Sequence, residues 1–271
     1  MEDKLKCYRE HLDETELSEA TRKIYYREAG NFLTYMEGRV ISKKETLAYK
    51  KYLFSLGRKM TSNNLYIVAV NHYLKFAGYD RCIIKTQRLQ RRQCPDNILD
   101  IEEYRKLMDY ALKSGRKKYY CIMRTLALTG IRISELSGCT VESLEHGKFT
   151  VNNKGRTREV YLPDKLIYEL KEYCREKEIR KGIIFMGTTG RPISRAAVYK
   201  MLHHMADMVG IPMNKVHPHS FRHLFALTYM EQYSNLFELA DILGHSSLET
   251  TRIYTATTGE EKRRKMENLR L

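Results

Sequence analysis

The chain has 271 residues, and 48 lysines and arginines outnumber 33 aspartates and glutamates, which gives a formal net charge of +15. This charge favours a polyanionic partner, with nucleic acid first, over a small neutral substrate. Because the six cysteines form no C-x-x-C pair and no apolar stretch is long enough to span a bilayer, we expect neither a zinc ribbon, a disulfide framework nor a membrane association, and we expect a cytoplasmic location.

Residues 1–80 have the apolar periodicity of helices that are separated by short turns. The segment 18–38 is predicted to be a helix with one apolar face. The segment 42–57 starts at Ser42 with Glu45 three residues later, which is the pattern of a capping box. A third helix is predicted over 61–78. We therefore expect an N-terminal domain, residues 1–80, that is a small helical bundle with basic polar faces.

Residues 81–98 are predicted to form a basic linker between two domains, because cations accumulate there and Pro95 breaks regular structure. Two interpretations are open for this segment. It is either a solvated tether or a basic strap across a phosphate backbone, and the charge of the whole chain favours the strap. The candidate DNA-binding residues are Arg81, Lys85, Arg88, Arg91 and Arg92.

Residues 99–271 are predicted to be a second domain, again mostly helical. The segment 147–163 alternates apolar and polar residues around an Asn-Lys-Gly turn, which is typical of a β-hairpin. The segment 182–187 is a candidate for a short additional strand, and residues 259–271 are a charged tail with apolar residues at helical spacing. The expected fold class is mainly α with a small β-hairpin.

The stretch HPHSFRH, residues 217–223, places histidines and an arginine at the start of a predicted helix. Zinc binding is disfavoured because Arg222 is a permanent cation and no carboxylate or thiolate lies nearby. The ordinary alternative for any one of these residues is a core histidine bonded to the backbone. The third interpretation is an anion site, because His219 and Arg222 share a helix face close to the positive end of the macrodipole.

Other single residues also have ordinary interpretations. Arg132 follows a predicted helix stop at Gly130, where either a phosphate or a salt bridge to Glu135 would offset its charge. A capping box at Ser246 is expected to begin the helix that carries Tyr254. Lys154 in the hairpin turn would by itself be regarded as solvated.

One ordered set of side chains in the predicted second domain changes these interpretations: Arg132, Lys154, His219, Arg222, His245 and Tyr254. With their local contexts TGIRISEL, HPHSFRH and LGHSSLETTRIY, they resemble the tyrosine recombinase (phage integrase) family, in particular its Xer-like members. The sequence departs from many relatives at Phe221 and Leu224. Residues 1–80 resemble the core-binding domain of that family in length and helical pattern only.

The resemblance implies a site-specific recombinase that needs no metal and no other cofactor. Tyr254 would attack a DNA phosphodiester and form a 3′-phosphotyrosyl intermediate, with a free 5′-hydroxyl as the other product. The remaining roles that the resemblance implies are transition-state stabilisation by Arg132 and Arg222, base assistance by His219, protonation of the 5′-oxygen by Lys154, hydrogen bonding to the phosphate by His245, and support of Arg132 by Glu135.

The resemblance also implies the partners. We expect double-stranded DNA, a homo-tetramer on paired DNA sites, a monomer in free solution, and association with a bacterial nucleoid. The reaction would serve integration, excision, inversion or dimer resolution. Two alternatives remain open, namely DNA relaxation like that of a type IB topoisomerase and a DNA-binding regulator without catalysis.

Overall fold

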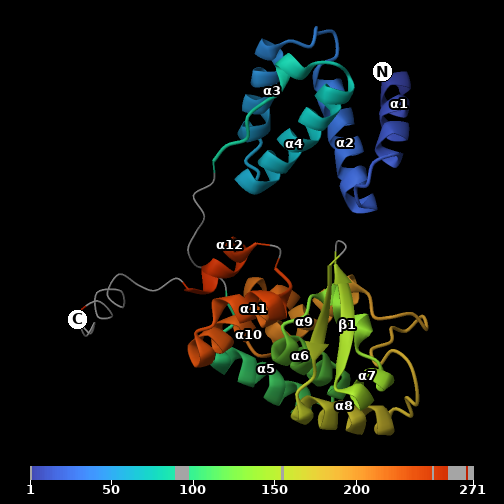
Figure 1. The fold of residues 1–271 in the computed structure, drawn as a ribbon, viewed down its shortest axis with the longest axis vertical. Helices are drawn as coiled ribbons and strands as arrows, with labels where there is room; N and C mark the ends of the chain where they lie inside the picture. Colours follow the sequence, from blue (N-terminus) through green and yellow to red (C-terminus); the bar gives the residue numbers. More distant parts are fainter. Residues whose placement is uncertain (1, 89–97, 154–155, 246, 256–266, 268–271) are drawn as a thin grey trace. The chain divides into compact units, whose positions relative to one another are not determined.

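The structure is a computed structural model that describes residues 2–88, 98–153, 156–245, 247–255 and 267 (Figure 1). The chain forms two compact units, Met1–Arg91 and Arg92–Leu271. Within the described ranges, no helix combines the length and the apolar character that crossing a bilayer requires. The expected fold class, mainly helical with one small antiparallel sheet, is confirmed.

The N-terminal unit is a helical bundle whose core is rich in aromatic residues. Phe32 lies edge-on to Tyr49 at 5.1 Å between ring centroids, and Tyr8 lies in the same way against Tyr73. Ser18 and Ser42 cap their helices by accepting backbone N–H groups, as serines at this position commonly do. The elements are α1 (Glu2–Asp13), α2 (Glu19–Tyr35), α3 (Lys43–Ser55), α4 (Met60–Phe76) and the 3-10 helix η1 (Asp80–Cys82).

The first part of the expected linker is bound to the N-terminal unit. The amide of Asn71 bonds both backbone groups of Ile84, and that of Asn64 bonds both backbone groups of Gln87. Ile84 is buried in the core of this unit. Residues 80–88 therefore form an ordered edge of the bundle, whereas the linker was expected to begin at residue 81.

The C-terminal unit is built around α6, which packs against α5, α8 and α10. Leu107, Ile122, Leu126, Leu166 and Phe221 are completely buried in its core. The helices are α5 (Ile101–Lys113), α6 (Lys117–Thr129), α7 (Val141–His146), α8 (Asp164–Glu176), α9 (Arg195–Met208), α10 (Pro218–Tyr233), α11 (Leu236–Leu243) and α12 (Leu248–Thr251), with the 3-10 helices η2 (Ile133–Gly138), η3 (Met213–Lys215) and η4 (Arg252–Thr255).

The hairpin formed by β1 (Lys148–Asn153) and β2 (Arg156–Tyr161) confirms the alternating pattern in the sequence. The expected strand over 182–187 was wrong, because its residues make only the isolated bridges Thr140↔Ile183 and Met186↔Pro192. Ile184 and Phe185 are each 1% exposed, so this apolar run is a buried loop that fills the core.

Two glycines in the left-handed backbone conformation allow separate segments to lie close together. Gly130 ends α6 with φ of 60°, and Gly244 ends α11 with φ of 63°. A Cβ at Gly130 would lie 2.6 Å from the ring of Phe225, and one at Gly244 would lie 2.7 Å from Cδ of Arg158. Only glycine combines this backbone conformation with such close approach.

Candidate active site

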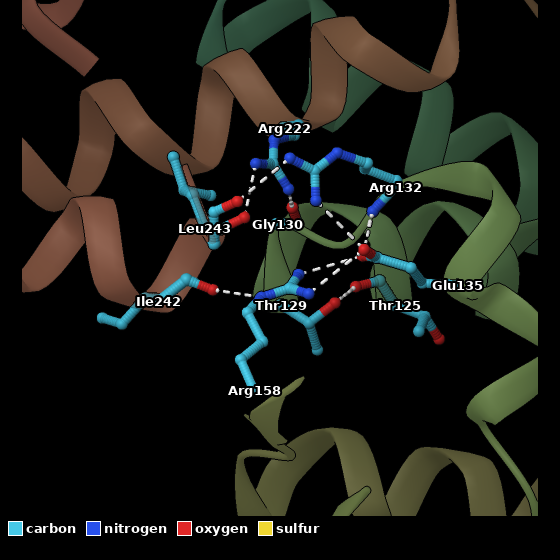
Figure 2. A network of polar contacts seen from close by, with 10 residues as sticks. Thr125, Thr129, Gly130, Arg132, Glu135, Arg158, Arg222, Ile242 and Leu243 are labelled. Carbon is cyan, nitrogen blue, oxygen red and sulfur yellow. Dashed lines mark hydrogen bonds and ion pairs between the residues drawn. The ribbon is translucent and has the colours of Figure 1, made fainter. Parts of the chain in front are cut away.

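Glu135 is the acidic centre of a cluster of arginines (Figure 2). Its carboxylate accepts hydrogen bonds from both Nη atoms of Arg158, at 3.1 and 2.9 Å, and from Nη1 of Arg132 at 3.1 Å. It also accepts the backbone N–H of Arg132 at 2.8 Å, so it caps η2 while it holds the side chain. Burial alone would raise the pKa of the Glu135 carboxyl, but the hydrogen bonds and charges of Arg158 and Arg132 lower it.

Three consecutive carbonyl groups at the end of α11 accept hydrogen bonds from three arginines (Figure 2). The pairs are Arg158 with Ile242 at 2.9 Å, Arg222 with Leu243 at 2.7 Å, and Arg132 with Gly244 at 3.3 Å. The negative end of the helix dipole lies here, so it partly offsets the gathered positive charge. The end of α11 therefore fixes the arginines relative to one another and to His245, the next residue after Gly244.

Arg222 is the least balanced of these cations. It is 4% exposed, and it donates to the carbonyl oxygens of Gly130 and Leu243, each at 2.7 Å. Among the described residues it forms no ion pair. Burial, together with the charges of Arg132 and Arg158, lowers its pKa to about 10. A bound anion would remove this electrostatic cost.

The histidines of the stretch 217–223 have different surroundings. His217 is the N-cap of α10, where its Nδ1 accepts the backbone N–H of Ser220 at 3.2 Å, and Pro218 is the first residue of the helix, as expected. Burial lowers the pKa of His219, and the charges of Arg222 and Arg132 contribute to that shift. No group of three or more potential metal ligands is found in the part of the chain that the structure describes.

His245 is held between the arginines and α12. Its backbone N–H donates to Ala240 across the end of α11, and its Nδ1 lies 2.8 Å from Oγ1 of the buried Thr251. Burial, together with the charges of Arg222, Arg132 and Arg158, lowers the pKa of His245 to about 4. The N-cap of α12 is Ser247 and not Ser246, which lies outside the described residues, so the expected capping box was misplaced.

Tyr254 lies in η4, 8% exposed, and packs against Ala226, Leu239 and Leu243. Its hydroxyl is hydrogen-bonded to Nδ1 of His223 at 2.7 Å. Burial raises the pKa of the Tyr254 phenol to about 12, and the charge of Arg222 opposes that rise. Tyrosine and arginine are therefore close enough to interact electrostatically within a single chain.

The structure brings together five of the six expected residues: Arg132, Arg222, His219, His245 and Tyr254. Lys154 lies outside the described residues, and so do Arg91 and Arg92 of the expected DNA-binding set. Arg81, Lys85 and Arg88 are exposed on the N-terminal unit. The expected helical tail, residues 259–271, also lies outside the described residues apart from Glu267.

A family model described as the phage integrase family matches residues 97–261. The chain belongs to this family. It is 28% identical over 264 residues to the tyrosine recombinase XerA of Pyrococcus furiosus, which covers 94% of this chain and 89% of the relative. It is 29% identical over 272 residues to the tyrosine recombinase XerD of Staphylococcus saprophyticus, which covers 92% and 91%. The resemblance found in the motifs is confirmed.

Solved structures have the same fold. The Tn1549 transposon integrase in complex with transposon right end DNA superposes with a TM-score of 0.77 at 16% identity, over 98% of both chains. A crystal structure of XerA recombinase gives a TM-score of 0.55 at 23% identity, over 100% of this chain and 99% of the other. The likeness covers both units of this phage integrase family member.

Sequence reasoning missed Arg158, and it gave His223 no role in the site. Arg158 pairs with Val151 across the hairpin and is two residues from Val160, and both valines are buried. An arginine on the apolar face of a strand was the signal that could have identified it. His223 was noted within the matching motif, but nothing in the sequence placed it near Tyr254.

We expect Arg158→Met to lower the free energy of unfolding by about 3 kcal/mol, because it removes one partner of a buried ion pair. The Arg158 and Glu135 side chains are only 12% and 7% exposed. Urea denaturation of the full chain measures the effect. The matched control is Lys148→Met on the same hairpin, whose ion pair with Glu159 is 46% and 42% exposed and should contribute at most about 1 kcal/mol. Equal losses of unfolding free energy in both variants would contradict the conclusion that the ion pair of Arg158 is a buried, stabilising one.

The two strongly shifted histidines predict a loss of stability in acid. His223 and His245 have pKa values of about 4 in the folded chain, against about 6.5 when unfolded. The unfolded chain therefore binds more protons between these values, and stability falls as the pH drops from 6.5 towards 4. From pH 7 to pH 5 we expect these two groups to cost about 4 kcal/mol together. Urea denaturation at both pH values measures this change. The double variant His223→Asn, His245→Asn should lose less free energy of unfolding than wild type between the two pH values, because it lacks both groups.

Proposed function

We propose that the protein is a site-specific DNA recombinase that cleaves and rejoins DNA through a bond between Tyr254 and a 3′-phosphate. The observation that carries this proposal is the balance of charge in the site. Three arginines gather around one carboxylate, and the buried Arg222 has no ion-pair partner among the described residues. Tyr254 lies close enough to Arg222 for each to affect the pKa of the other. This is a site for one phosphodiester beside one nucleophile.

The chemistry divides among the side chains as follows. The oxygen of Tyr254 attacks phosphorus, the bond to the 5′-oxygen breaks, and the phosphotyrosyl bond keeps the free energy that rejoining requires. Arg132 and Arg222 stabilise the negative charge that develops on the nonbridging oxygens. Lys154 donates a proton to the departing 5′-oxygen, His219 assists the loss of the phenolic proton, and His245 donates a hydrogen bond to the phosphate.

Glu135 has a positioning role in this proposal. A carboxylate repels phosphate, but this one is fully occupied by Arg132 and Arg158. It therefore orients Arg132 without facing the substrate as a free charge. The end of α11 provides the second fixed point for Arg132 and Arg158, through the carbonyl groups of Gly244 and Ile242.

Double-stranded DNA is the proposed partner, and paired sites held by a homo-tetramer are the proposed assembly. The net charge of +15 provides a nonspecific affinity that depends on salt. Arg81, Lys85 and Arg88 add exposed positive charges on the N-terminal unit. Solved relatives include XerH bound to difH substrate and a lambda integrase dimer bound to a core site. A cytoplasmic, nucleoid-associated location follows from this proposal.

The test is covalent capture of DNA. The purified chain is incubated with sheared genomic DNA of its source organism, protein-linked fragments are precipitated from detergent, and their ends are sequenced. We expect a small set of recurrent sites, with protein on the 3′-phosphate side. Two such sites on one plasmid should then recombine. Relaxation of a plasmid without exchange would favour the topoisomerase alternative, and DNA binding without any covalent link would favour the regulator.

A further inference from the structure

The hydroxyl of Tyr254 has an unexpected partner. His223 follows Arg222 directly on α10, and its Nδ1 lies 2.7 Å from the tyrosine oxygen. The ring centroids are 5.6 Å apart at an angle of 54°. The mechanism proposed above assigns no role to His223, and it assigns assistance of the tyrosine to His219. Among the described residues, His223 is the hydrogen-bond partner of this hydroxyl.

Both partners are neutral at physiological pH. Burial, together with the charges of His219, His217 and Arg222, lowers the pKa of His223 to about 4. Burial raises the pKa of Tyr254 to about 12. Such widely separated values keep the proton on the phenol in the DNA-free protein. The contact is thus a hydrogen bond between neutral groups, which fixes a position without ionising the nucleophile.

The contact between His223 and Tyr254 joins α10, which also carries Arg222, to η4. Arg222 and His223 are neighbours on α10, so the arginine that is proposed to hold the phosphate and the histidine that bonds the tyrosine belong to the same helical turn. The helix η4, by contrast, is a single short turn that follows α12. Tyr254 otherwise belongs to an apolar cluster with Ala226, Leu239 and Leu243, and apolar packing of this kind does not specify the direction of its oxygen.

We propose that His223 is the positioning residue for the nucleophile. Its Nδ1 holds the Tyr254 hydroxyl at a fixed position relative to the phosphate site that we propose at Arg222. This rests on the proposed function of Tyr254. Losing the hydrogen bond leaves DNA binding intact and slows the attack on phosphorus. A misplacement of about 1 Å at a reacting atom can cost about 100-fold in rate.

The experiment uses three substitutions. His223→Leu removes the hydrogen bond, His223→Asn places an amide close to where Nδ1 was, and His223→Gln places the amide about one bond further out. The matched control is His72→Leu, because Nδ1 of His72 makes the same kind of bond to the hydroxyl of Tyr8, at 2.9 Å, in the other unit. The first measurement is the single-turnover rate of covalent capture at saturating DNA, on a nicked duplex from the genomic selection.

We expect His223→Leu and His223→Gln to slow capture by about 10- to 100-fold at unchanged DNA affinity, while His223→Asn stays within about threefold of wild type and His72→Leu has no effect. Wild-type or faster capture by His223→Leu overturns the proposal, and so does equally slow capture by His223→Leu and His223→Asn.

The second measurement does not depend on catalysis. It follows the ¹³Cζ signal of labelled Tyr254 in DNA-free protein, assigned by its absence in Tyr254→Phe. The signal should move in His223→Leu and stay near its wild-type position in His223→Asn. An unmoved signal in His223→Leu overturns the contact itself. If wild type captures no DNA while the signal responds as expected, the proposed function fails and the contact stands.

Discussion

Tyr254→Phe is expected to eliminate covalent DNA capture, to less than about one thousandth of the wild-type rate, because it removes the oxygen through which the protein bonds to phosphorus in the proposed reaction. DNA binding in a gel shift should be unchanged. The ring of Tyr254 packs against Leu239 and Leu243, and phenylalanine keeps those contacts. The measurement is the fraction of a nicked duplex that becomes protein-linked on a denaturing gel.

The substitution should be structurally mild. It leaves Nδ1 of His223 without its partner, which should cost about 1–2 kcal/mol. That is a fraction of the about 5–15 kcal/mol typical of a folded domain. Tyr168→Phe is the control, because that ring is 67% exposed on α8. Capture that persists in Tyr254→Phe and disappears in another tyrosine variant would move the nucleophile to that residue.

Much of the fold could be predicted because its signals are local. Ser42 caps a helix, Gly130 and Gly244 end helices, and the alternation over 147–163 gives a hairpin, each through contacts within a few residues. The run 182–187 failed because a short apolar segment buried on all sides has no period that separates a strand from a loop. Two adjacent serines before α12 made the cap ambiguous by one residue.

The site could be predicted only in part, for a different reason. The motifs identify the order and the types of the site residues. The structure brings together those of them that lie in the described part of the chain. The supporting contacts join segments that are distant in sequence. Arg158 meets Glu135 and Ile242 across 23 and 84 residues, and His223 meets Tyr254 across 31. With 48 lysines and arginines in the chain, no local pattern chooses the one that completes the cluster.

Arg222→Lys should have the second largest effect. The guanidinium of Arg222 donates through two nitrogens to Gly130 and Leu243, on two different segments, at 2.7 Å each. A lysine ammonium keeps the charge but lacks the planar fork, so it cannot bond both carbonyls and still present donors to a phosphate. We expect covalent capture to fall by about 100-fold or more, measured at saturating DNA on the nicked duplex.

Loss of folding must be separated from loss of chemistry, and the chain offers a matched arginine for that purpose. Arg124 donates to both oxygens of Glu169, at 3.0 and 3.2 Å, in the same unit and outside the site. Arg124→Lys and Arg222→Lys each remove a guanidinium that donates two buried hydrogen bonds. Each substitution should lower the free energy of unfolding by about 1–3 kcal/mol. Only Arg222→Lys should slow capture. Equal rates in the two variants would mean that Arg222 merely joins α6 to α11, and the phosphate site would then have to depend on Arg132 alone.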